Sequence, residues 1–197
     1  MHLRPSYPIV TSRLRLRPLT TGDLDALLGY HSSPEVHRYL PMQAMDAANI
    51  LERLTKGNWS RSTLEEEGQI IMLGVELAAT SQLVGDVMLR WTSNKNRSGE
   101  IGYVLDPAHL GRGYATEAAV AVLRLAFAEL GLHRVITRID ARNGPSIALS
   151  ERLGFRREAL LIENDWVRGE WTDEVNFAML ENEWRLLQPG HAANGQS

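Results

Sequence analysis

The sequence predicts an α/β protein with one mixed sheet and helices on both of its faces. Stretches with alternating hydrophobic residues are separated by stretches in which they recur every three to four positions, in the order strand, two helices, three strands, helix, strand, helix, two strands. Hydrophobic residues make up 44% of the 197 positions, enough for a sizeable core. No linker or repeat interrupts the chain, so we expect a single domain over 1–188 and a disordered tail at 189–197.

Charge and composition narrow the classes of function. The net charge of −3 and the isoelectric point near 6.1 provide no general field for a polyanion, so we expect no nucleic-acid partner. The absence of cysteine excludes disulfides, thiolate metal sites and a cysteine nucleophile, and fits a reducing cytoplasm. Because the amino terminus lacks the apolar core of a signal peptide and no stretch approaches a membrane span, we expect a cytoplasmic protein without a membrane partner.

The first half of the chain predicts one strand, two helices and three further strands. Residues 13–17 alternate arginine and leucine, as in a half-buried strand. Thr20, followed three residues later by Asp23, is typical of a helix start, and a second helical region covers about 46–62. The three strands are expected at about 69–77, 82–90 and 99–105, with short polar connections between them.

The second half begins with a long amphipathic helix at about 112–130, ended by Gly131 as its cap. A strand at 135–139 follows. Asn143 is expected to cap a short helix that Gly154 closes, with Phe155 making the apolar contact of a Schellman-type cap. Strands near 156–163 and 174–180 complete the domain.

The most informative stretch is His-Leu-Gly-Arg-Gly-Tyr-Ala-Thr-Glu-Ala, residues 109–118, between an expected strand and the long helix. Glycines at the start of a helix leave backbone N–H groups unpaired and let a ligand approach closely, which favours an anion such as a phosphate. The P-loop pattern is absent, and the dinucleotide pattern fails because Thr116 stands where its third glycine belongs. Taken alone, Gly111 and Gly113 are equally typical of a tight turn.

Two motifs together resemble the GNAT acyl-CoA transferases. Residues 110–115 match the family pattern Gln/Arg-x-x-Gly-x-Gly/Ala except at Leu110, and residues 143–155 read Asn-Gly-Pro-Ser-x-x-Leu-x-x-x-Leu-Gly-Phe. The segments 11–17 and 169–173 are similar to the branch that contains the ribosomal-protein N-terminal acetyltransferases. The resemblance covers roughly residues 10–187. It implies the GNAT fold, in which a mixed, mostly antiparallel sheet splays at the acyl-CoA site.

The resemblance also implies the donor, acetyl-CoA, and the residues that bind it. The glycine loop would hold the pyrophosphate through backbone N–H groups, which the departure at Leu110 leaves available. The end of the preceding strand would pair with the pantetheine arm, beside which the cap of the short helix would lie. The expected donor-binding residues are Tyr103, Val104, Leu105, Leu110, Gly111, Arg112, Gly113, Tyr114, Ala115, Thr116, Asn143 and Ser146.

Acyl transfer needs a neutral amine, a polarised carbonyl and a proton for the leaving thiolate. Without cysteine, a thioester intermediate on the enzyme is excluded, which favours direct transfer in a ternary complex. By the resemblance, Glu100 is the base, acting through water, and Ser146 protonates the thiolate. Glu100 can equally be a surface carboxylate at a strand end, and Ser146 a capping residue. The backbone N–H of Val104 or Leu105 would polarise the carbonyl.

The acceptor is open at this level. Neutralising an α-amine at pH 7 costs about 1.4 kcal/mol and a lysine roughly 4.6 kcal/mol, a modest argument for a protein N-terminus. The alternatives are a small amine, including an antibiotic, a longer acyl-CoA as donor, or an acyl-CoA-binding sensor without catalysis. Candidate walls of the acceptor pocket are Tyr39, Trp91 and Trp166. Homodimers are common in such folds, although no residue pattern here indicates one.

Other polar residues have mainly structural interpretations. A carboxylate at Glu117, one turn into the long helix, complements the helix dipole. Asp173 can order the loop after Trp171 or stabilise a hairpin. We expect no metal, because the histidines lack the paired spacing of metal ligands. Those considered are His31, His37, His109 and His133.

Overall fold

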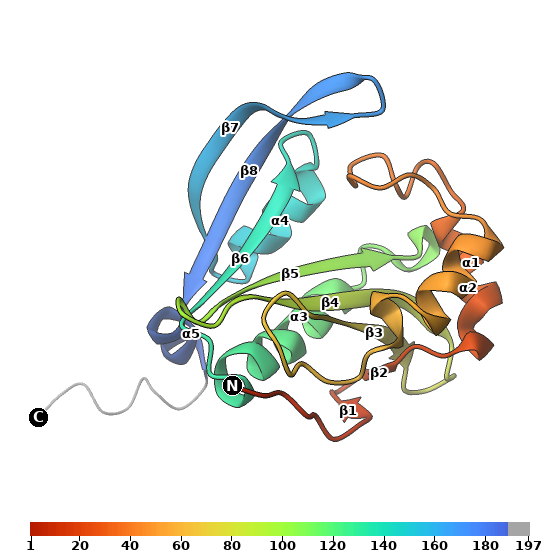
Figure 1. Ribbon diagram of the computed structural model, residues 1–197, viewed down its shortest axis with the longest axis horizontal. Helices are drawn as coiled ribbons and strands as arrows, with labels where there is room; N and C mark the ends of the chain where they lie inside the picture. The colour runs from red at the N-terminus through yellow and green to blue at the C-terminus, as the bar shows by residue number, and fades with distance from the viewer. Residues whose placement is uncertain (189–197) are drawn as a thin grey trace, which may run out of the picture.

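The structure is a computed structural model that describes residues 1–188, so the tail expected at 189–197 lies outside the described residues. One eight-stranded sheet runs through the molecule in the order β1-β2-β3-β4-β5-β6-β8-β7 (Figure 1). Its strands are β1 Ile9–Val10, β2 Leu14–Pro18, β3 Ile70–Leu77, β4 Leu83–Ser93, β5 Ser98–Leu105, β6 Arg134–Asp140, β7 Arg156–Val167 and β8 Glu170–Leu180. The helices are α1 Leu24–His31, α2 Ala47–Thr55, α3 Tyr114–Arg124, α4 Gly144–Arg152 and α5 Glu181–Leu187.

The expected fold class and element order are confirmed, with two additional elements and several differences in length, among them the two last strands, which extend to Val167 and begin at Glu170. The two-residue strand β1 and the terminal helix α5 were not predicted. The helix expected over 46–62 ends at Thr55, and Asn58–Ser60 forms a separate 3-10 turn. The long helix begins at Tyr114 rather than 112 and continues through a π-helical turn at Leu125–Glu129.

The sheet is antiparallel at every strand pair except β5 with β6. That parallel contact comprises Ser98 with Arg134, Gly99 with Val135, and Glu100 with Ile136. Beyond Glu100, β5 pairs only with β4. In Figure 1, β6, β8 and β7 turn away from β5, so the sheet opens into a fork whose apex lies at Glu100.

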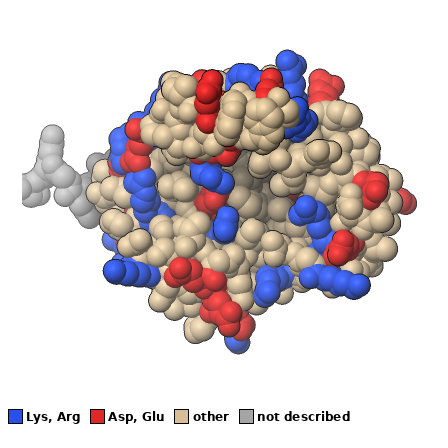
Figure 2. All heavy atoms as spheres, turned by 45° about the horizontal axis from the view of Figure 1, so that its top comes forward, with Lys and Arg blue, Asp and Glu red and all other residues tan. Residues whose placement is uncertain are grey.

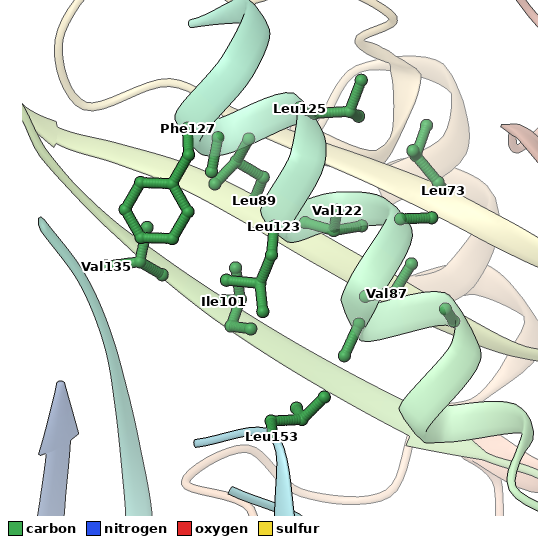
Figure 3. Close-up of a cluster of buried hydrophobic side chains, with 14 of the residues drawn as sticks. Leu73, Val87, Leu89, Ile101, Val122, Leu123, Leu125, Phe127, Val135 and Leu153 are labelled. Carbon is green, nitrogen blue, oxygen red and sulfur yellow. The ribbon is translucent and has the colours of Figure 1, made fainter. Parts of the chain in front are cut away.

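Alternation along the strands separates the two faces of the sheet. On one face α3 packs over β3, β4 and β5, with Leu123 fully buried among side chains such as Leu89 and Ile101 (Figure 3). Replacing such a leucine by alanine typically costs 2–5 kcal/mol. On the other face α1 and α2 cover a second cluster that contains Tyr30 and Trp59. The fork therefore lies between two separately packed layers.

The predicted helix caps explain how the chain enters and leaves these layers. Asn143 accepts a hydrogen bond from the Ser146 N–H at 3.2 Å, which confirms it as the cap of α4. Gly154, at φ +88°, ends that helix, and the N–H of the buried Phe155 donates to the carbonyl of Ser150. Gly131, at φ +72°, ends the long helix as expected. Within the described residues, no helix is long and apolar enough to cross a membrane.

Candidate active site

A cavity of about 250 Å³ opens at the fork, on the face of the sheet that α1 and α2 cover. Its floor comes from β4 and β5, one side from the segment 39–42, and the other side from β6 and the β7–β8 hairpin. A hollow with charged side chains in and around it is visible on the molecular surface in Figure 2. The carboxylates that line the cavity are Asp86, Glu100, Asp140, Asp165, Asp173 and Glu174. Arg138 is the single arginine or lysine among the described lining residues.

Glu100 lies at the apex of the fork. Its side chain is 12% exposed and accepts a long hydrogen bond, 3.4 Å, from Nε of Arg138 on β6. Nη1 of Arg138 also lies 3.8 Å from the buried carboxylate of Glu174. Burial raises the pKa of Glu174, while the charge of Arg138 acts in the opposite direction. Arg138 thus links the candidate base to a second carboxylate across the fork.

The glycine loop lies directly after β5 and ends at α3. Gly111 and Gly113 have φ angles of +73° and +79°, a conformation that side chains disfavour. The first N–H groups of a helix, here those of Tyr114, Ala115 and Thr116, have no partner within the helix itself. Within residues 1–188, no side chain caps the start of α3 in their place. These donors and the positive end of the helix dipole fit a pyrophosphate. The side chain at Leu110 is exposed and leaves the backbone accessible.

Across the fork from this loop, the first turn of α4 meets β5. The hydroxyl of Tyr103 donates to the carbonyl of Ser146 at 3.4 Å. Burial raises the pKa of Tyr103, and the hydroxyls of Ser146 and Ser150 lower it by a smaller amount. The expected donor-binding residues of β5 and α4 are therefore in contact. The remaining strand residues, Val104 and Leu105, continue β5 toward the loop.

Two of the three aromatic residues expected in the acceptor pocket do not line the cavity. Tyr39 lines it. Trp91 is 2% exposed in the α3-side core, so that prediction is wrong: on β4 it shares a face with Val87 and Leu89. Trp166 is 60% exposed and packs edge-on against Trp171, with 5.2 Å between ring centroids. Its neighbours in sequence line the cavity, so alternation places Trp166 on the outer face.

Both residues given a structural interpretation have structural contacts. Glu117 accepts hydrogen bonds from the hydroxyls of Thr11 and Ser12 and forms an ion pair with Arg13. It therefore joins the start of α3 to the chain before β2. Asp173 accepts a hydrogen bond from the backbone N–H of Glu163 at 2.8 Å, across the β7–β8 hairpin. That contact confirms its hairpin role.

The polar residues that the sequence analysis missed include Asp86 and Arg138, which line the cavity, and Arg168, which lies in the adjoining hairpin turn. Asp86 interrupts the apolar run of β4, and Arg138 alternates with apolar residues on β6, so both patterns were visible. Arg168, in the β7–β8 turn, had no such signal. Its guanidinium donates to the backbone carbonyls of residues 38, 40 and 42, more than 120 positions away in sequence. It ties the hairpin to the segment that forms the opposite side of the cavity.

Known proteins resemble this chain in sequence and in fold. The family model described as an acetyltransferase (GNAT) domain matches residues 13–156. An uncharacterized N-acetyltransferase, p20, of Bacillus licheniformis is 30% identical over 89% of this chain and 97% of its own. A spermidine N(1)-acetyltransferase of Vibrio cholerae is 25% identical over 89% and 97%.

A solved GNAT-family acetyltransferase from Bacillus anthracis superposes with a TM-score of 0.76 at 28% identity, covering 92% of this chain and 99% of its own. The match of the family model covers more than half of the chain, and the solved structure has the same overall fold. Members of this family use acetyl-CoA. The chain therefore belongs to the GNAT family and is an acetyl-CoA-dependent N-acetyltransferase.

Proposed function

We propose that the protein transfers the acetyl group of acetyl-CoA directly to a primary amine held in the cavity at the fork. The observation that carries this proposal is the position of Glu100. Glu100 lies at the apex of the fork, on β5, the strand that leads into the glycine loop. It also lines the cavity, on the face of the sheet that α1 and α2 cover. One strand thus connects a site suited to the donor with a site suited to the acceptor.

In the proposed reaction, acetyl-CoA supplies the activated thioester and this chain supplies the proton transfers. Glu100 takes a proton from the ammonium group through water, and Arg138 orients its carboxylate. The neutral amine then forms the C–N bond, with the carbonyl polarised by the backbone N–H of Val104 or Leu105. As the C–S bond breaks, Ser146 gives its proton to the thiolate and takes up the second proton that the nitrogen releases as the amide forms, while the proton on Glu100 passes to solvent. Because the free-energy cost of deprotonation falls with the pKa of the amine, an amine of lower pKa is easier to activate.

The acceptor that the cavity favours is a small amine carrying positive charge. Six carboxylates and one guanidinium line the described cavity, so its field attracts cations. The relative from Vibrio cholerae is a spermidine N(1)-acetyltransferase, which supports this choice.

A second candidate acceptor is a protein N-terminus. The motifs at 11–17 and 169–173 resemble the ribosomal-protein branch, and an α-amine is easier to deprotonate than a lysine. Arg13 of the first motif contacts the glycine loop, and the second motif is in the hairpin beside the cavity. The contact of Arg13 with the glycine loop and the position of the second motif beside the cavity support this second candidate.

A thiol-release assay separates these possibilities. The panel contains spermidine, butylamine, a neutral-flanked peptide with a free N-terminus, and the same peptide with its N-terminus blocked. The proposal expects amine-dependent release of CoA, fastest with spermidine. Faster turnover of the free peptide would favour the second candidate. Tight binding of CoA without turnover of any amine would contradict transfer and favour an acyl-CoA sensor.

A further inference from the structure

Strand β4 carries a buried carboxylate on the floor of the cavity. Asp86 lies in the run Leu-Val-Gly-Asp-Val-Met-Leu, and its side chain is only 3% exposed. Burying a carboxylate costs free energy unless its oxygens accept hydrogen bonds, so each of the two oxygens is expected to have a donor.

The two carboxylate oxygens of Asp86 have different surroundings. Oδ2 accepts hydrogen bonds from the hydroxyl of Tyr30 and from Nε2 of His31, both at 2.8 Å. No residue among 1–188 donates to Oδ1. The buried polar side-chain atoms without a partner in that range are Trp91 Nε1 and Asn176 Oδ1. Since Asp86 Oδ1 has no donor and is not one of these enclosed atoms, it is open to the cavity that Asp86 lines.

The partners of Oδ2 fix the orientation of the carboxylate. Nδ1 of His31 lies 3.2 Å from Nε2 of His37, whose Nδ1 donates to the carbonyl of Met42 at 3.2 Å. Because His31 donates to Asp86 and His37 donates to that carbonyl, one proton must lie between the two rings for this contact to be a hydrogen bond. Burial lowers the pKa of His37 and favours its neutral form, in which Nε2 can accept a hydrogen bond.

The location of Asp86 relates it to the proposed reaction. It pairs in register with Val104, whereas Glu100 pairs with Arg90 four residues away on β5. At about 3.3 Å per residue, these positions are separated by roughly 13 Å along the strand. A group bound at Oδ1 would therefore lie beside the N–H groups proposed to polarise the thioester, and Glu100 would accept its proton through a chain of several waters rather than through a single one.

We propose that Asp86 Oδ1 binds the reacting amino group of the acceptor, and that Tyr30 and His31 are positioning residues that hold this oxygen toward the cavity. This assignment rests on the proposed function and adds a residue that contacts the acceptor. It also explains why a carboxylate stands next to Met88 on the face of β4 that lines the cavity. A purely structural Asp86 would need only the oxygen that Tyr30 and His31 already occupy.

The substitution Asp86→Asn tests this assignment at a single atom. Asparagine can keep its oxygen toward Tyr30 and His31, which places an NH₂ group where Oδ1 faced the cavity. Spermidine and butylamine share an ammonium group, so we expect the variant to bind both about 10- to 100-fold more weakly by calorimetry. Its affinity for acetyl-CoA and for N-butylacetamide, the acetylated form of butylamine, should change by less than about threefold, because neither presents an ammonium group.

The matched control is Tyr30→Phe, which removes one bond to Oδ2 and leaves Oδ1 in place. It should lower the melting temperature and have a smaller effect on amine binding than Asp86→Asn. Unchanged amine binding in a folded Asp86→Asn variant would overturn the assignment. So would equal weakening of the binding of butylamine and of N-butylacetamide, which would indicate a general loss of cavity shape.

Two further measurements keep the result decisive. If Asp86→Asn does not fold, the wild-type protein must still bind butylamine at least about tenfold more tightly than N-butylacetamide, and equal affinities overturn the assignment. If the wild type binds amines but never acetylates them, the proposed function fails while the binding comparison still tests Asp86. If it binds neither spermidine nor butylamine, the assignment is wrong.

Discussion

Arg13 and Glu117, which are 104 positions apart, form an ion pair that supports the glycine loop. Nε and Nη2 of Arg13 both lie 2.7 Å from Oε2 of Glu117, and the backbone N–H of Arg13 donates to Oε1. Nη1 of the same arginine donates to the carbonyl of Arg112 at 2.9 Å. The Arg13 side chain thus joins the chain just before β2 to the glycine loop and to the first turn of α3. The geometry of the loop therefore depends on a residue outside it.

Replacing Glu117 by glutamine should loosen the glycine loop. Hydrogen bonds to a charged group contribute about 1.5–3 kcal/mol, so we expect a loss of about 2 kcal/mol in the free energy of unfolding. That corresponds to a fall of about 4–8 °C in melting temperature for a chain of this size. The KM for acetyl-CoA should rise several-fold. Glu52→Gln, at an exposed position of α2, is the control and should change neither quantity. An unaltered KM would separate the ion pair from donor binding.

The same ion pair predicts how stability depends on pH. Burial opposes ionisation of Glu117, but hydrogen bonds from Thr11, Arg13 and Ser12 outweigh it and lower its pKa from the usual 4.5. Its contribution to stability is therefore complete above that unfolded value and is lost as the pH falls through the lower folded pKa. Melting curves of the wild type and Glu117→Gln, recorded from pH 7 to pH 3, should converge at the acid end. A constant difference would contradict this account.

Gly113→Val should impair binding of acetyl-CoA. Gly113 has a positive φ, and a Cβ there would lie 3.4 Å from Nη2 of Arg13, so the substitution strains the backbone and presses on the ion pair. Gly68→Val is a matched control: its φ is +89° and its Cβ would meet no atom within 4 Å, in a turn outside the glycine loop. Both variants should be less stable, but only the first should raise the dissociation constant of acetyl-CoA by tenfold or more in calorimetry. Equal affinities would remove this loop from the donor site.

Glu100→Gln should lower kcat about 100-fold or more, because a general base contributes roughly that factor. The acid limb of the pH–rate profile should disappear, since the group that titrates there is gone. Binding of acetyl-CoA, measured without acceptor, is the control and should be unchanged. Full activity at every pH would show that Glu100 is not the base and would favour its interpretation as a strand-end carboxylate.

Arg168→Ala should weaken acceptor binding without altering the chemical step. Its guanidinium donates to three backbone carbonyls of the segment beside Tyr39, and the substitution frees that side of the cavity. We expect the KM for the amine to rise about 3- to 10-fold with kcat changed by less than twofold. Arg157→Ala, at an exposed position of β7, is the control. A large fall in kcat with no change in KM would contradict a role in shaping the cavity.

The strand and helix pattern was largely predictable because each element carries its own local period. The strand at 99–105 and the caps at Asn143 and Gly154 depend on neighbouring residues only, and the structure confirms them. The elements that were missed, β1 and α5, are two and seven residues long and offer too few turns or alternations to recognise. The π-helical turn after α3 likewise has no periodic signal of its own.

The candidate site was predictable only where it is local. The glycine loop is one continuous segment, whereas the cavity joins β4, β6 and the hairpin through contacts such as that of Arg138 with Glu100. Trp91 was wrongly assigned to the acceptor pocket because the prediction used its aromatic residue type and not its position in the alternation of β4. It follows Leu89 by two positions and therefore faces the same core. Asp86 could have been found by asking why an apolar strand contains a carboxylate.

The fork at Glu100 also bears on the order in which substrates meet the enzyme. The glycine loop leads into α3 on one face of the sheet, and the cavity opens on the face that carries α1 and α2. A donor that approaches from the glycine loop and an amine that approaches through the cavity would not obstruct each other. Either substrate can therefore enter first, and the kinetic mechanism expected from this architecture is random sequential addition.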